Sequence, residues 1–242
     1  MEQKLVKKWV ITPGMCDYSG CLGIADIFTL FMDMASEHAE HIGLGGEAML
    51  ARGLFWITVK TKIHILKQPH MMREVVASTW PDKPTKRLCD RYYLLEDESG
   101  HVAEGRTEWA VMNIRKGMLE NISELYPDEL VPDDAPVCAD PVRRISRDFD
   151  GCEILGTYNV RSTDIDMGGH MNNAAYVYAV MSFFPISEQK KMHITDMEVS
   201  FVSQCFEGDT LTAFIRRSDT EYEIGLKRED GTLALLVLMK LG

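Results

Sequence analysis

The stretch at residues 164–176 reads DIDMGGHMNNAAY, and the interpretation of the whole chain starts from it. It places Asp166 and His170 four residues apart, with two glycines between them that allow a sharp backbone turn. Asn172 and Asn173 come next, and either side chain is a good N-cap for the apolar run that follows. The stretch therefore predicts a polar loop that leads directly into a helix.

A loop-to-helix junction of this kind can form a catalytic site. The first N–H groups of a helix lack an intrahelical partner and lie at the positive end of its dipole, so they can bind a carbonyl oxygen that is becoming an oxyanion. A nearby carboxylate or imidazole can activate water. The candidate catalytic residues are Asp166 and His170, and the candidate positioning residues are Gly168, Gly169, Asn172 and Asn173. The alternative is a purely structural turn with a helix cap, because turns are rich in the same residue types.

Length and composition restrict the class of protein. The chain has 242 residues, of which 45% are hydrophobic and 26% charged, as in an ordinary soluble globular protein of one large domain or two smaller ones. The first residues lack the apolar segment of a signal peptide, and no run approaches the roughly 18 apolar residues of a membrane span. We therefore expect a cytoplasmic protein with no membrane partner.

The charge is acidic and unevenly distributed. A net charge of −11 argues against a nucleic acid partner. Residues 1–125 hold 15 Lys/Arg and 17 Asp/Glu, a net of −2, whereas residues 126–242 hold 11 and 20, a net of −9. If an acidic partner docks, local basic patches on the first half are the better candidates for its contacts.

The cysteines and histidines show no metal pattern. Six cysteines occur without a Cys-x-x-Cys pair or a secretory signal, and the histidines lack a companion pattern, so we expect reduced thiols and no metal site. Cys16 and Cys21 flank a turn, which leaves a redox or metal role there as a minor alternative.

The first half predicts one helix followed by an antiparallel sheet. Apolar residues recur at helical spacing from Ile24 to Ile42 and predict a long amphipathic helix that ends at the glycines of residues 43–46. Residues 54–109 then show four strand-like segments, after an earlier short one at residues 8–12. Residues 125–150 carry Pro127, Pro132, Pro136 and Pro141 among acidic residues, and predict an extended linker.

The second half repeats this order. A strand is predicted at residues 154–161, then the polar loop, then a helix at about 173–184, and then strands at 194–206, 210–217, 222–228 and 232–241. Sliding the halves by 149 residues sets Asp17 on Asp166 and Cys21 on His170. The first half lacks the histidine, so we expect one catalytic half and one binding and structural half.

The polar loop resembles the Asp-x-Asn-x-His-Val-Asn-Asn signature of the acyl-ACP thioesterases, which release fatty acids from acyl carrier protein. The segments MCDYSG, GLFWITVKTKIHIL, VASTWP and WAVMNIRKGML also resemble bacterial members of that family. The resemblance implies an α+β fold of two tandem hot-dog domains, each a long helix wrapped by an antiparallel sheet. It implies an N-terminal domain at 1–125 that binds the acyl chain, a linker at 126–150 and a catalytic domain at 151–242.

The family's catalytic network consists of the Asp, Asn and His of the signature and a Glu on a later strand. By resemblance these positions are Asp166, Gly168, His170 and Gln204, and two of the four differ. Gly168 supplies no side-chain amide, and Gln204 can orient water but cannot act as a base. We expect Asp166 to act on water directly or by orienting His170, with His170 as general base or carbonyl polariser. Direct attack by Asp166 to form an anhydride is a lesser alternative.

The resemblance also implies the substrate and partner. It implies an acyl carrier protein with a fatty acyl thioester, whose hydrolysis requires no cofactor. Candidate residues along the acyl chain are Phe28, Met32, Trp56 and Trp80, all of which also suit a plain core. Two alternatives stay open: an acyl-CoA thioesterase of the same fold, and a non-catalytic protein that binds acyl groups or docks a carrier. Free sheet edges could pair the chain into a homodimer.

Overall fold

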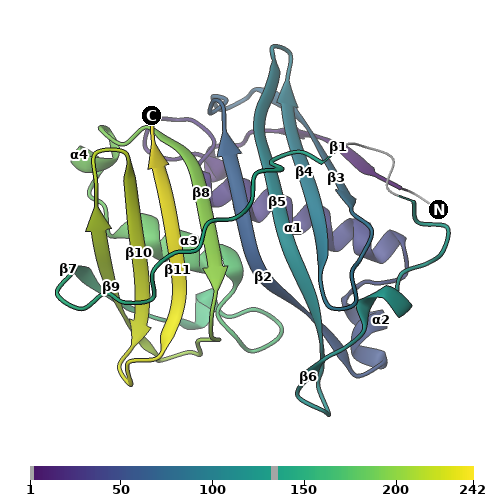
Figure 1. The fold of residues 1–242 in the computed structure, drawn as a ribbon. Coiled ribbons are helices and arrows are strands. Elements are labelled where there is room, and N and C mark those ends of the chain that lie inside the picture. The colour runs from purple at the N-terminus through teal and green to yellow at the C-terminus, as the bar shows by residue number, and fades with distance from the viewer. Residues whose placement is uncertain (1–2, 132–135) are drawn as a thin grey trace. The chain divides into compact units, whose positions relative to one another are not determined.

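The computed structural model describes residues 3–131 and 136–242, so Pro132 of the predicted linker lies outside the described residues. The chain divides into two compact units, Met1–Asp140 (unit 1) and Pro141–Gly242 (unit 2). Each unit is an antiparallel sheet with one main helix packed on it (Figure 1). The segment predicted as a linker at 126–150 is therefore shared between the two units, with the division at Asp140.

Unit 1 contains the longer helix. Its strands are ordered β1-β3-β4-β5-β2, and the short β6 pairs with β5. The strand bounds are β1 Leu5–Val10, β2 Leu54–Ile65, β3 Glu74–Pro81, β4 Cys89–Asp97, β5 Gly100–Asn113 and β6 Met118–Leu119. The helices are α1 Ile24–His41 and α2 Gly46–Ala51, with 3-10 turns at Pro13–Met15 and Ile122–Glu124.

The apolar face of α1 packs on the inner face of this sheet. The ring of Phe31 stacks on Tyr93 of β4 with 4.7 Å between ring centroids. Gly105 of β5 allows the helix to approach, because a Cβ there would lie 2.5 Å from the Phe31 ring. The charged side chain of Arg91 is also buried on this face, and its guanidinium lies 3.0 Å from the Nδ1 of His38 on α1. The sheet residues beside Arg91 and Tyr93 in sequence point to the opposite, outer face.

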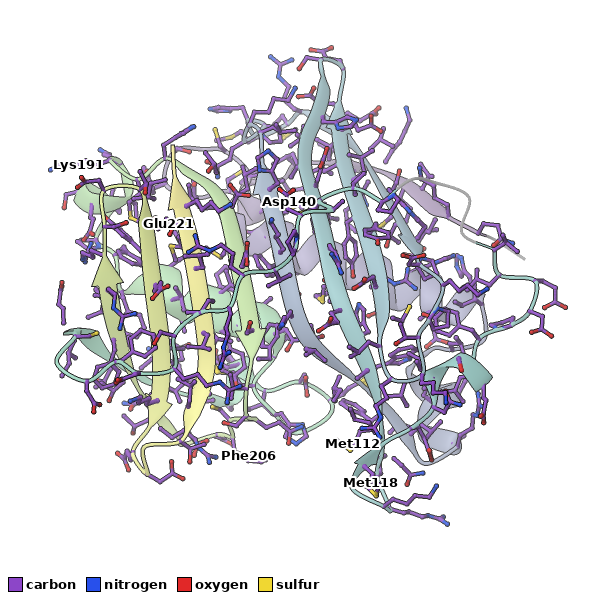
Figure 2. The ribbon with its side chains drawn as sticks, in the orientation of Figure 1. Met112, Met118, Asp140, Lys191, Phe206 and Glu221 are labelled. Carbon is purple, nitrogen blue, oxygen red and sulfur yellow. The ribbon has the colours of Figure 1, made fainter. Side chains whose placement is uncertain are left out.

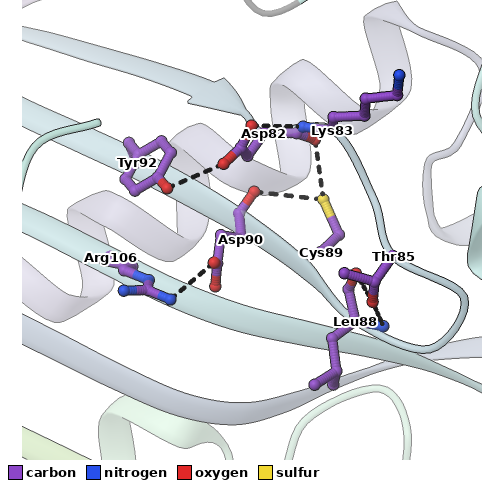
Figure 3. A network of polar contacts seen from close by, with 8 residues as sticks. All are labelled: Asp82, Lys83, Thr85, Leu88, Cys89, Asp90, Tyr92 and Arg106. Atoms are coloured by element: carbon purple, nitrogen blue, oxygen red, sulfur yellow. Dashed lines mark hydrogen bonds and ion pairs between the residues drawn. The ribbon is translucent and has the colours of Figure 1, made fainter. Parts of the chain in front are cut away.

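The outer face of unit 1 carries a polar network (Figure 3). The Tyr92 hydroxyl donates to Asp82 over 3.0 Å, and Arg106 donates to Asp90 over 2.7 Å. Burial of the Tyr92 hydroxyl, together with the nearby Asp82 carboxylate, raises the pKa of Tyr92. Beside this network Val137 packs on an apolar cluster that includes Tyr92. Part of the predicted linker therefore covers the outer face of unit 1.

Unit 2 has the same plan with shorter helices. Its strands are ordered β8-β11-β10-β9-β7. Their bounds are β7 Glu153–Asn159, β8 Ile194–Phe201, β9 Thr210–Arg217, β10 Glu221–Arg228 and β11 Leu233–Leu241. The helices are α3 Asn173–Ser182 and α4 Ile186–Gln189, and a 3-10 turn spans Ser162–Asp164.

Aromatic contacts hold the chain against the two faces of this sheet. On the inner face, Tyr176 of α3 meets Phe201 of β8 edge-on at 5.9 Å between centroids. On the outer face, Phe149 lies over Gly225, where a Cβ would come within 2.4 Å of its ring. Phe149 belongs to a buried cluster with Ile145 and two leucines of β11. The second part of the predicted linker thus covers the outer face of unit 2.

The predicted element order is confirmed, with differences at the ends. The first strand runs over Leu5–Val10 where residues 8–12 were expected, and β8 ends at Phe201 where the sequence predicts Phe206. The short helices α2 and α4 are not predicted by the sequence pattern. In the described part of the chain, no helix combines the length and apolarity needed to cross a membrane.

Candidate active site

The loop predicted as the active site is a narrow antiparallel turn. The Asp166 N–H donates to the His170 carbonyl over 2.9 Å, and the Gly169 N–H donates to the Asp166 carbonyl over 3.0 Å. Gly169 has φ +77°, a conformation that suits glycine. Asp166 and His170 are thus directly opposite each other, and residues opposed in this way project their side chains from the same face. The structure brings the two candidate catalytic residues together.

The Asp166 carboxylate stabilises its own turn. Its Oδ1 accepts the backbone N–H of Gly168 at 2.8 Å and, more weakly, the backbone N–H of His170 at 3.5 Å. No hydrogen bond joins this carboxylate to the His170 ring within the described residues. The option in which Asp166 orients His170 through its side chain is therefore not realised here, and Oδ2 is the oxygen that can act on water.

The two glycine amides are already engaged. The Gly168 N–H is bound to Asp166 Oδ1, and the Gly169 N–H is bound to the Asp166 carbonyl. Neither can also bind an oxyanion while the turn is intact, so the positioning role predicted for them is limited to shaping the loop. The imidazole N–H of His170 is another donor on this face of the loop.

The His170 ring contacts Phe206. The ring centroids lie 5.3 Å apart with an interplanar angle of 61°, an edge-to-face arrangement. Phe206 lies in the connection from β8 to β9, at the lower end of unit 2 in Figure 2, and its side chain is 45% exposed. Among the residues that the structure describes, none hydrogen-bonds either ring nitrogen of His170. Both nitrogens are therefore free to meet a substrate.

The ends of the loop are fixed by backbone bonds. The Met171 N–H donates to the Cys205 carbonyl, and the Asn172 N–H donates to the Asp164 carbonyl, each over 2.8 Å. The Asp164 carboxylate accepts from the Arg161 N–H at 2.8 Å and from the Tyr158 hydroxyl at 2.9 Å. Asp164 therefore has a structural role at the start of the loop.

The two asparagines begin helix α3. Asn172 is its N-cap, and the side-chain oxygen accepts the Ala174 N–H at 2.8 Å. Asn173 is the first residue of the helix and is itself in contact with other groups. The capping prediction is confirmed at Asn172, and this use of its oxygen fixes the side chain at the helix end.

Gln204 precedes Cys205, whose carbonyl accepts the backbone N–H of Met171; we call this backbone bond, and the matching one in unit 1, the clamp of the loop. Its backbone carbonyl accepts from Arg228 at 3.4 Å, and its side chain is exposed, with no hydrogen-bond partner for the amide in the described ranges. Cys205 is buried, and burial raises the pKa of its thiol. The structure therefore shows no contact between the Gln204 side chain and Asp166 or His170 within the described residues, whereas Cys205 is a packing residue.

Unit 1 contains a copy of this loop without the histidine. The Asp17 N–H donates to the Cys21 carbonyl over 2.9 Å, and the Gly20 N–H donates to the Asp17 carbonyl over 3.0 Å. Gly20 has φ +76°, and Asp17 Oδ1 accepts the Ser19 N–H at 2.8 Å. Each bond matches one in unit 2 at the predicted shift of 149 residues. The repeat predicted from a short sequence match is therefore confirmed by the backbone.

The four candidate acyl-chain residues occupy different places in unit 1. Phe28 is fully buried on α1, and Met32 is a half-buried residue of the same helix. Trp56 is half-buried, donates its ring N–H to the Leu44 carbonyl at 2.8 Å and meets Trp109 edge-on. Trp80 packs with Tyr92 on the outer face, away from α1 and from the other three residues.

Residues 3–131 and 136–242 contain no cluster of three or more His, Cys, Asp or Glu side chains that could hold a metal ion. The six cysteines are all free thiols. Cys16 and Cys21 lie on opposite strands of the unit 1 loop but in different pairs, Cys16 with Leu22 and Cys21 with His70.

Phe206 is the site residue that the sequence did not predict. Its position directly after Cys205 could have indicated it. In unit 1 the residue that follows the corresponding carbonyl, that of Pro69, also carries a ring. In unit 1 the Leu22 N–H donates to the Pro69 carbonyl over 2.9 Å, and His70 follows. This match is visible only when the segment around Pro69 in unit 1 is aligned with the segment around Cys205 in unit 2.

Comparison with known proteins identifies the family. The acyl-ACP thioesterase N-terminal domain matches residues 2–130, and the acyl-ACP thioesterase C-terminal domain matches residues 152–232. The chain belongs to the acyl-ACP thioesterase family. Among relatives, it is 24% identical over 194 residues to acyl-[acyl-carrier-protein] hydrolase FATB3, chloroplastic, of Cuphea viscosissima, which covers 75% of this chain and 47% of that protein. It is 25% identical to the dodecanoyl-[acyl-carrier-protein] hydrolase, chloroplastic, of Umbellularia californica, over 78% of this chain and 53% of that protein.

Solved structures of acyl-ACP thioesterases share the fold. An acyl-ACP thioesterase from Bacteroides thetaiotaomicron superposes with a TM-score of 0.89 at 20% identity, covering 99% of this chain and 98% of that one. The 12:0-ACP thioesterase from Umbellularia californica gives 0.88 at 18% identity, covering 100% and 98%. The predicted α+β class of two tandem hot-dog folds is thereby confirmed. The chain spans about half the length of the curated relatives that it matches.

Proposed function

We propose that this member of the acyl-ACP thioesterase family hydrolyses the thioester of an acyl carrier protein and releases a free fatty acid. The observation that carries the proposal is the pairing of Asp166 and His170 on one face of the loop that leads into α3. Family membership supplies the substrate class, and the geometry of the loop supplies the division of roles.

Asp166 and His170 act separately in the proposed reaction. The free Oδ2 of Asp166 accepts a proton from a water molecule as the water oxygen bonds to the thioester carbon. The His170 ring N–H donates to the carbonyl oxygen, which becomes an oxyanion in the tetrahedral intermediate. Collapse of the intermediate breaks the carbon–sulfur bond, and the proton held by Asp166 passes to the departing thiolate. The products are a fatty acid and the free thiol of the carrier.

This division follows from the hydrogen bonds of the loop. A backbone oxyanion site would need free N–H groups, and those of Gly168 and Gly169 are occupied by Asp166. If Asp166 acted through His170, its carboxylate would be hydrogen-bonded to the imidazole ring, and no such bond occurs within the described residues. His170 as the donor and Asp166 as the base is the assignment that uses the groups left free. Direct attack by Asp166 Oδ2 on the thioester is the alternative covalent route.

We place the acyl chain against α1 of unit 1 and the carrier on basic residues of the same unit. Phe28 is buried on α1, Met32 lies on the same helix, and Trp56 of β2 is partly buried against an apolar cluster of unit 1. The charge counts support this choice of docking side, since residues 1–125 carry a net charge of −2 and residues 126–242 a net of −9. An acidic carrier is repelled less by the first half.

A panel of acyl-ACPs of graded chain length, compared with the matched acyl-CoAs, tests the proposal. Release of free acid at a higher kcat/KM from acyl-ACP supports it. A preference for acyl-CoA would assign the chain to a CoA thioesterase instead. The exchange of the family's Asn and Glu for Gly168 and Gln204 favours a second candidate, a non-catalytic acyl-binding protein, which predicts binding of acyl-ACP without any release.

A further inference from the structure

We propose that Phe206 is a positioning residue that holds the His170 imidazole in the orientation needed to reach the thioester carbonyl. The inference rests on the proposed hydrolase function and names a residue to which that function assigns no role. It starts from the observation that the Asp166 side chain, the expected partner of His170, is bound to the backbone of the loop.

The orientation of an imidazole ring has to be fixed by some contact. The rotation of an exposed histidine side chain between rotamers is fast, and a donor that rotates freely spends little time in the productive direction. Within the described residues, the ring of His170 makes its one ring contact with Phe206, at 5.3 Å and 61°. Phe206 therefore takes the place that a carboxylate holds in other catalytic histidines.

The backbone holds Phe206 in position for this contact. The carbonyl of Cys205 is bound by the Met171 N–H at 2.8 Å, which ties the segment before Phe206 to the residue after His170. The Phe206 N–H donates to the Asp209 carboxylate at 2.9 Å, and the Asp209 N–H donates back to the Phe206 carbonyl at 3.1 Å. The ring is therefore presented by a segment fixed on both sides, although its outer edge is in solvent.

The loop of unit 1 provides independent support. There His70 follows Pro69, whose carbonyl accepts the Leu22 N–H. The His70 ring lies over the turn, because a Cβ added at Gly20 would lie 3.2 Å from the Cε1 of His70. Both loops thus carry a ring at the same place in the clamp. In unit 1 that ring covers glycine, and in unit 2 it meets the residue that the mechanism uses.

Phenylalanine suits a positioning role in one further respect. It has no donor or acceptor, so it leaves both His170 nitrogens for the substrate and for solvent. An edge-to-face aromatic contact is weak enough that its loss should change the occupancy of the productive ring orientation by roughly 2- to 10-fold. The expected effect on turnover is of the same size.

Substitutions at Phe206, with a matched control, test the proposal by kinetics. Phe206→Leu keeps an apolar side chain and removes the ring, and Phe206→Tyr keeps the ring. We expect Phe206→Leu to lower kcat on acyl-ACP by roughly 2- to 10-fold with KM unchanged, and Phe206→Tyr to restore it. Ile186→Ala removes another exposed apolar side chain of unit 2, at 53% exposure, and should leave both constants unchanged.

A spectroscopic readout separates this proposal from the proposed function. In protein labelled at the histidine rings with ¹³C, relaxation of the His170 ring carbons, assigned by the loss of their signals in His170→Ala, should show larger ring motion in Phe206→Leu and wild-type motion in Phe206→Tyr. This result would stand even if wild type released no fatty acid. Unchanged motion of the His170 ring in Phe206→Leu would overturn the proposal. So would equal loss of kcat in both Phe206 variants, or a rise in KM alone, which would make Phe206 an acyl-chain contact.

Discussion

The backbone N–H of Asp166 donates to the carbonyl of His170 over 2.9 Å, which sets their side chains on one face of a tight turn. The Asp166 carboxylate then divides its two oxygens. Oδ1 accepts the Gly168 N–H and maintains the turn, and Oδ2 is left for chemistry. One residue thus shapes the site and supplies its base, which is why substitutions here must separate folding from turnover.

Substitution of one glycine in each loop by alanine tests the turn geometry through the stability of the protein. Gly169→Ala places a Cβ in open space but at φ +77°, so we expect only backbone strain, roughly 1 to 2 kcal/mol of lost stability. Gly20→Ala has nearly the same φ, +76°, and its Cβ would also meet the Met71 side chain at 3.0 Å and the His70 ring at 3.2 Å. Gly20→Ala should therefore destabilise the protein more than Gly169→Ala. Urea unfolding midpoints provide the measurement, and the reverse order would contradict the geometry.

Gln204→Glu tests the departure from the family's carboxylate. The side chain is exposed, so the change should leave the fold intact. A carboxylate beside the loop adds a second proton acceptor, and we expect kcat on acyl-ACP to rise several-fold at pH 7, where a glutamate of ordinary pKa near 4.3 is ionised.

Gln204→Ala serves as the control for that change. It removes the amide without adding charge, so it should not raise kcat. Equal rates for Gln204→Glu and wild type would show that the carboxylate position contributes nothing in this chain.

An ion pair of unit 1 predicts a pH effect on stability. The hydrogen bond from Lys67, followed by that from the Ser99 N–H, lowers the pKa of Asp97 from 3.8 to about 2. Because the pKa is depressed in the folded state, the stabilisation is fully present above pH ~4 and is lost as the pH falls through about 2. Thermal unfolding of Asp97→Asn should therefore show a smaller decline between pH 4 and 2 than wild type. A decline of the same size would mean that Asp97 is not linked to acid unfolding.

The loop and its repeat were predictable because they depend on local residues. Gly20 and Gly169 supply the positive φ, and Asp17 and Asp166 each accept an N–H two residues later. These are short-range requirements, so they leave a pattern that a shift of 149 residues reveals. Helix α1 was predictable for the same reason, since its buried residues recur with the helical period.

The rest depends on contacts between distant segments. The sequence does not show which face of the sheet Trp80 occupies. Strand β3 is buried on both faces, and Val137 covers the outer face at Trp80, so the apolar residues of the strand do not alternate with polar ones. Phe206 lies 36 positions after His170 in the sequence and meets it only through the clamp at Cys205. The division of the Asp166 oxygens could not be predicted either, because it depends on which N–H groups the folded turn presents.

The most direct test of the account is the rate of free fatty acid release from acyl-ACP by wild type and by Asp166→Asn. Asparagine keeps an oxygen for the Gly168 N–H and removes the base, so we predict an unchanged unfolding temperature and a kcat lower by about 10². His170→Ala should lower kcat by a similar factor. Wild-type turnover in Asp166→Asn, measured on protein that binds acyl-ACP normally, would contradict the assignment of Asp166 as the residue that activates water.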